Sequence, residues 1–228
     1  MQTRPTAIAV PATSYSTALD RGTAHRVLRN TYALLSMTLL FSAAVAGAAV
    51  AFNLPAPGII LTLVVYFGLL FGIHKLKNSG MAVGLVFALT GFMGWTLGPL
   101  LTRTLALPAG GQVVMLALGA TGAVFLAMSA YATTTKRDLS WMGGFLFAGM
   151  IVAVLAGLAA IFFQIPALAL TVSAVVALLS AGLILFETKQ IVDGGETNYV
   201  LATVSLFVSI FNLFTSLLQL FGFASSDD

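Results

Sequence analysis

The sequence predicts an all-α polytopic membrane protein that crosses the bilayer seven times. Hydrophobic residues make up 59% of its 228 residues and charged residues only 7%, whereas about a quarter of a soluble domain is charged. The ten basic and seven acidic side chains fall almost entirely in short gaps between long apolar runs. Because a charge inside hydrocarbon costs several kcal/mol, these gaps mark where the chain meets water.

Seven apolar runs lie between these gaps, and most have roughly the twenty residues that a helix needs to cross a ~30 Å hydrocarbon core. The second run is the shortest, and its boundaries are the least well defined. All are continuous and rich in Leu, Ala, Gly and Phe, without the alternation of a membrane β-barrel. We therefore predict membrane-spanning helices over Thr31–Ala51, Gly58–Ile73, Met81–Leu101, Val113–Ala132, Trp141–Phe163, Ala167–Phe186 and Tyr199–Phe223.

The distribution of Lys and Arg predicts the orientation of the chain. With a cytoplasmic N-terminus, Arg103 is the only basic residue in an outer segment, and the inner segments hold the rest: Arg4, Arg21, Arg26, Arg29, Lys75, Lys77, Lys136, Arg137 and Lys189. This bias follows the positive-inside rule. We expect a flexible cytosolic tail over residues 1–30, a seven-helix transmembrane domain over 31–223, and a short external tail over 224–228.

Several function classes are disfavoured by composition. The chain has no cysteine, so it can form neither a disulfide nor a zinc–thiolate site. It carries no His-Glu-x-x-His or Gly-x-Ser-x-Gly motif, and Ser205, Ser209 and Ser216 have no general base within the seventh run. Its net charge of +3 is spread over loops rather than gathered on one helix face. We expect no catalysis, no cofactor, no metal site and no nucleic-acid binding.

Two polar stripes are the candidate functional feature. In the seventh run, five polar residues at alternating spacings of four and three fall within about 80° of one another on a helix, and we expect this face to point into the bundle. The sixth run carries three polar residues at intervals of seven. The two sets are Ser205, Ser209, Asn212, Ser216 and Gln219, and Ser173, Ser180 and Glu187.

These stripes have two interpretations, which the spacing leaves open. They could line a path for water or an ion, with Glu187 near the inner boundary. Alternatively, they form hydrogen bonds between packed helices, each contributing about 1 kcal/mol. The Gly-rich stretch Gly91–Pro99 similarly favours close helix packing over a gating hinge, and the pairs Gly68/Gly72 and Gly94/Gly98 indicate close approach of backbones.

Four segments of the chain carry a family resemblance: Ile184–Ile191, Gly194–Tyr199, Ser205–Phe214 and Lys136–Ser140. By these segments the chain from about His25 onward resembles the Bax inhibitor (TMBIM) family. A further set, Arg29–Tyr32, Gly194–Tyr199 and Phe223–Ser225, is similar to the bacterial inner-membrane branch of that family. The family resemblance implies six helices around a central seventh.

Some members of this family are described as pH-sensitive calcium leaks, whose sensor is a pair of aspartates sharing a proton. Here Glu187 matches the first acid, but Ser209 stands at the second position. A carboxylate and a hydroxyl can hydrogen-bond, yet they cannot share a titrating proton in that way. The resemblance places a basic latch near His74 or Lys75, with different loop lengths in this chain.

The resemblance to the inner-membrane branch implies a non-enzymatic protein that associates with the membrane-anchored protease FtsH, and with its membrane regulators, in quality control. Residues 1–24 have the composition of a segment that an ATPase could grip. The alternative is a leak for calcium or another cation through the helix bundle. In that case Glu187 would face the ion, and neutral oxygens such as that of Asn212 would add weak coordination.

Overall fold

A computed structural model describes residues 12–225 of the chain, with side chains from residue 22 onward. All regular structure in this part is helical, and seven helices are long and apolar enough to cross a membrane. The predicted all-α polytopic fold is therefore confirmed. The helices are α1 (Ala12–Ala51), α2 (Ile59–Leu76), α3 (Met81–Leu105), α4 (Gly110–Thr134), α5 (Ser140–Phe162), α6 (Pro166–Val192) and α7 (Tyr199–Ala224).

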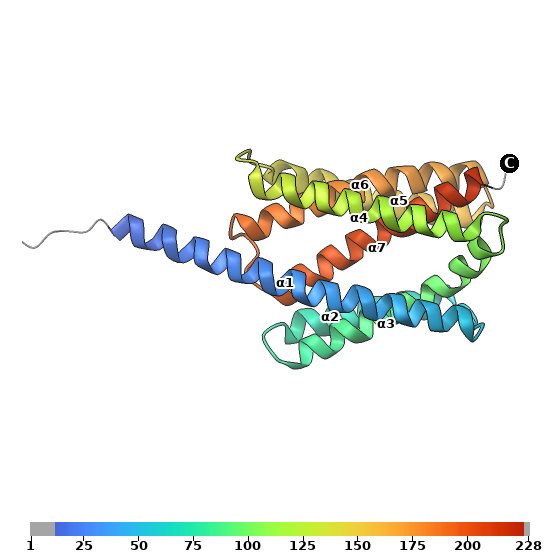
Figure 1. The fold of residues 1–228 in the computed structure, drawn as a ribbon, viewed down its shortest axis with the longest axis horizontal. Helices are drawn as coiled ribbons and strands as arrows, with labels where there is room; N and C mark the ends of the chain where they lie inside the picture. Colours follow the sequence, from blue (N-terminus) through green and yellow to red (C-terminus); the bar gives the residue numbers. More distant parts are fainter. Residues whose placement is uncertain (1–11, 226–228) are drawn as a thin grey trace, which may run out of the picture.

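Helix α7 occupies the centre of the bundle. It runs obliquely between a layer formed by α1, α2 and α3 and a layer formed by α4, α5 and α6 (Figure 1). It packs directly against α1, α3, α4 and α6, while α2 packs mainly against α3 and α5 against α6. The central seventh helix implied by the family resemblance is thus present, with α2 and α5 in outer positions.

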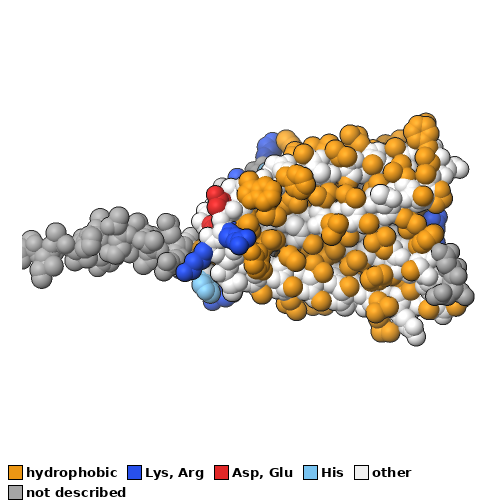
Figure 2. All heavy atoms as spheres, turned by 90° about the horizontal axis from the view of Figure 1, so that it is seen from above, with side chains coloured by type: hydrophobic (Ala, Val, Ile, Leu, Met, Phe, Trp, Pro, Cys, Tyr) orange, Lys and Arg blue, Asp and Glu red, His pale blue; other side chains and the backbone are white. Residues whose placement is uncertain are grey.

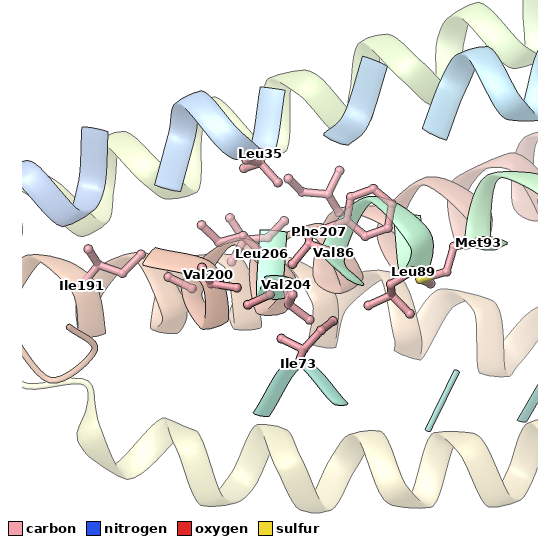
Figure 3. Packing of buried hydrophobic residues seen from close by; sticks show 14 of the residues in the cluster. Leu35, Ile73, Val86, Leu89, Met93, Ile191, Val200, Val204, Leu206 and Phe207 are labelled. Carbon is pink, nitrogen blue, oxygen red and sulfur yellow. The ribbon is translucent and has the colours of Figure 1, made fainter. Parts of the chain in front are cut away.

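The main core forms where α7 meets the other helices. Leu206 and Phe207 of α7 are completely buried, and around them lie Leu35 of α1, Ile73 of α2 and Leu89 of α3 (Figure 3). Aromatic and aliphatic side chains at this crossing come from both ends of the sequence. The first half of the chain and its last helix therefore depend on each other for burial.

Three helix boundaries differ from the predicted spans by four residues or more. Helix α1 begins at Ala12, so helix covers residues 12–30 of the segment that we expected to be a flexible tail. This stretch has no proline and contains good helix formers such as Ala, Leu and Arg. Residues 1–11 lie outside the described part of the chain. Helix α3 continues past Pro99 to Leu105, and α6 continues to Val192.

Close packing of α3 against α1 explains the Gly-rich stretch. A Cβ built on Gly91 would lie 2.7 Å from Phe41, and one on Gly98 would lie 2.8 Å from Ala49. At Gly94 it would collide with the backbone oxygen of Ser42. The packing interpretation therefore accounts for these glycines. Gly68 of α2, in contrast, faces open space, so it makes no comparable approach.

Charged side chains gather at one end of the bundle, and hydrophobic side chains cover the flank between the two ends (Figure 2). Five basic or histidine side chains are exposed in the last turn of α2 or in the turns after α2 and α4, namely His74, Lys75, Lys77, Lys136 and Arg137. An apolar flank fits a surrounding bilayer. Which end faces the cytoplasm stays a prediction of the positive-inside rule.

Candidate functional site

The contact between α6 and α7 brings Glu187 next to Ser209. The Ser209 hydroxyl lies 3.1 Å from Glu187 Oε1 and 3.0 Å from Oε2, so it donates to the carboxylate of the neighbouring helix. Ser209 is 2% exposed and Glu187 is partly buried. The structure thus pairs the two positions that the family resemblance singled out. Their function stays a prediction.

Glu187 lies within α6 rather than at the end of the helix. The predicted sixth span ended at Phe186, which left this carboxylate at the boundary. In the structure α6 runs on to Val192, so Glu187 stands more than one turn inside the helix. The carboxylate is therefore held within a helix–helix contact rather than in a loop.

A second polar contact joins the same helices near their other end. Ser173 Oγ lies 2.8 Å from Gln219 Oε1 and 3.0 Å from the carbonyl oxygen of Ala169. Since Ser173 and Glu187 are fourteen residues apart on α6, the two contacts are about 21 Å apart along the helix axis. Hydrogen bonds at both ends therefore fix the register of α6 against α7.

The other members of the stripes are not uniformly enclosed. Ser180 and Ser216 are buried and Asn212 is partly buried, whereas Ser205 and Gln219 are exposed. The expectation that the whole stripe points into the bundle therefore does not hold at its ends. Burial along this face does not follow contact with α6 alone, since Gln219 is exposed although its side chain contacts Ser173 of α6.

The predicted basic latch does not reach Glu187. His74 and Lys75 are exposed in the last turn of α2, a helix that packs mainly against α3. Within residues 22–225 the only ion pair with a nitrogen–oxygen distance of 4.0 Å or less joins Lys189 to Asp193. The same part of the chain contains no group of three or more His, Asp or Glu placed to hold a metal ion.

The connection between α6 and α7, at the Lys- and Arg-rich end of the bundle, has its own hydrogen-bond system, which the sequence-based reasoning missed. Asn198 Oδ1 accepts hydrogen bonds from two backbone amides in the first turn of α7. Its Nδ2 donates to the backbone oxygen of Lys77 at 3.1 Å and to Asn78 Oδ1 at 3.2 Å. Gly194 has φ +77°, a conformation that favours glycine. An Asn directly before an apolar run is the signal that predicts such a cap.

Lys189 holds the connection between α4 and α5 close to this system, and Asp138 orders that connection locally. The ammonium of Lys189 is 2.9 Å from both the backbone oxygen of Thr135 and the carboxylate of Asp193. Asp138 accepts hydrogen bonds from the hydroxyl and the amide of Ser140. These two bonds hold the pKa of Asp138 below its ordinary value of 3.8. The α2–α3, α4–α5 and α6–α7 connections are therefore joined by hydrogen bonds at one end of the bundle.

Comparison with known proteins assigns the chain to one family over nearly its whole length. The model of the family described as "Inhibitor of apoptosis-promoting Bax1" matches residues 24–226. The chain is 53% identical to "Modulator of FtsH protease YccA" of Escherichia coli K12 over 204 residues, which cover 89% of this chain and 92% of that protein. "Inner membrane protein YccA" of a second E. coli strain has the same identity and coverage. An uncharacterized protein of Pseudomonas aeruginosa, PA2604, is 50% identical over 89% of this chain and 91% of its own length.

Proposed function

Because this chain belongs to the Bax inhibitor family of membrane proteins, we propose that it is a non-enzymatic modulator of the FtsH protease in the bacterial inner membrane. One observation carries the proposal, namely 53% identity over 92% of the length of a relative named as that modulator. At this level of identity the membrane-spanning surfaces available to a partner should be largely shared. The seven apolar helices fit a multi-pass inner-membrane protein.

The fold supports a way in which such modulation could work. A processive protease must pull its substrate out of the bilayer, and here α1 is packed along α3 and against α7. Pulling on the N-terminal segment would have to break the glycine contacts at Gly94 and Gly98 before any other helix moved. A chain that is gripped but slowly extracted would occupy the protease and slow the turnover of other substrates.

The first test is co-purification in mild detergent from bacterial membranes. We expect FtsH or its membrane regulators in near-stoichiometric yield, together with slower decay of an FtsH-degraded membrane reporter when this chain is overproduced. The variant Ser205→Ala, an exposed change that should leave the bundle intact, serves as the control. Absence of FtsH from the preparation, with unchanged decay of the reporter, would overturn the proposal.

The N-terminal segment is tested separately. Deletion of residues 2–20 should leave membrane insertion intact and lengthen the half-life of the protein in cells that contain FtsH. A control variant replaces these residues with a Gly/Ser sequence of the same length, which separates the effect of length from that of composition. An unchanged half-life after the deletion would remove the segment from the mechanism.

A cation leak is the second candidate, and the Glu187–Ser209 contact favours it because it places a carboxylate between two membrane-spanning helices. One carboxylate is weak coordination for calcium, which takes six to eight oxygen ligands in proteins. Flux into reconstituted vesicles should fall in Glu187→Gln and Ser209→Ala but not in Ser205→Ala. Flux that none of these changes affects would remove the site from any leak.

A further inference from the structure

A pocket of about 370 Å³ opens at the end of the bundle opposite the Lys- and Arg-rich loops. The last turns of α3, the first turns of α6 and the last turns of α7 form its walls. Most of its lining is apolar, including Leu100, Leu107, Leu170 and Leu218, and its polar members include Arg103 and Gln219. Helices α3 and α6 make no extensive contact with each other over the described residues, which leaves the pocket between them.

The chemistry of this pocket suits a molecule with an apolar chain and an anionic head. Apolar cavities are poor sites for water, so a hydrocarbon chain is a more favourable occupant of the leucine-lined space. Arg103 is exposed in the last turn of α3, where the positive-inside rule places the outer membrane–water boundary. Its planar guanidinium matches the oxygen geometry of a phosphate.

Charge complementarity favours an anionic lipid over a neutral one. The acidic residues with described side chains are Asp138, Glu187, Asp193 and Glu196, and all lie in the inner half of α6 or in the inner connections, while Asp20, Asp227 and Asp228 lie outside the residues with described side chains. Within the described residues Arg103 has no ion-pair partner. We propose that this pocket binds an anionic phospholipid, with an acyl chain between α3, α6 and α7 and the phosphate on Arg103.

Native mass spectrometry of the full-length protein tests this proposal by counting retained lipids in a titration with phosphatidylglycerol. Phosphatidylcholine with the same acyl chains serves as the headgroup control. We expect Arg103→Gln to weaken binding of the first phosphatidylglycerol about fivefold, which corresponds to ~1 kcal/mol per basic residue near an anionic lipid. Arg137→Gln, the same change at an exposed arginine of the opposite end, should have no effect.

A second variant tests the apolar part of the pocket. Ala169→Trp places a large ring among the lining residues and should reduce retention of both lipids, with thermal unfolding used to check that the variant is folded. Equal retention of the two lipids by the wild type, or equal effects of Arg103→Gln and Arg137→Gln, would overturn the proposal. So would full competition by inorganic phosphate, because it would indicate a free-anion site. None of these outcomes bears on FtsH.

Discussion

Substitution of Gly94 by alanine should weaken the contact between α1 and α3, although the helix propensity of α3 alone would predict a gain in stability. The added Cβ would lie 3.0 Å from the hydroxyl oxygen of Ser42, 3.1 Å from its carbonyl carbon, and closer still to its carbonyl oxygen. A flexible side chain could rotate away, but a backbone carbonyl inside a helix cannot. The two helices must therefore separate locally.

The expected magnitude follows from two opposing effects. Overpacking of a closely packed site costs about 1–3 kcal/mol, and a collision with backbone belongs at the upper end of that range. Alanine is a better helix former than glycine by about 1 kcal/mol, which offsets part of the loss. We therefore expect Gly94→Ala to lower the free energy of unfolding by about 2 kcal/mol.

Gly84 provides a matched control in the same helix. It is exposed, and a Cβ added there meets nothing within 4 Å, so Gly84→Ala should be neutral or stabilising by up to about 1 kcal/mol. Equilibrium unfolding in mixed micelles with increasing dodecyl sulfate, followed by the fluorescence of Trp95 and Trp141, measures both variants. Equal stability of the two variants would refute the close-packing argument.

Three further predictions concern the polar contacts. Ser209→Ala removes the hydroxyl that donates to the Glu187 carboxylate and should destabilise the protein by about 1–2 kcal/mol. Ser205→Ala on the same helix should change the free energy of unfolding by less than about 0.5 kcal/mol. Equal effects of the two substitutions would contradict the contact between Ser209 and Glu187. Asn198→Ala removes the cap of α7 and its bonds to the α2–α3 turn, and in the same unfolding assay it should lose about 1–2 kcal/mol. The pKa of the Asp138 carboxyl, followed by NMR, should lie below 3.8, because the hydrogen bonds from Ser140 favour the ionised form. The hydrogen bonds between Asp138 and Ser140 are therefore present above the lowered pKa and are lost as the pH falls through it. Ser140→Ala should raise that midpoint, and an unchanged midpoint would contradict the assignment.

The hydrogen bond between Ser209 and Glu187 could be predicted only in part from the sequence. Helical spacing predicts that each residue lies on a polar face, and the family resemblance pairs the two positions. Neither predicts that Glu187 lies more than one turn inside α6, since the helix continues through charged and polar residues to Val192. In that last part of α6, the charge of Lys189 is paired with Asp193 and bonded to the backbone oxygen of Thr135.

By itself, the sequence determined the number of helices, their approximate spans and the family. These follow from the cost of placing charge and open backbone in hydrocarbon, which acts locally along the chain. The tertiary structure decided which polar residues are enclosed, because burial depends on the oblique path of α7 between the two helical layers. It also decided that Arg103 and Gln219 border one apolar pocket. Residues more than a hundred positions apart meet only when helices pack, and helical periodicity indicates which face of a helix is buried but not which residues of the other helices meet it.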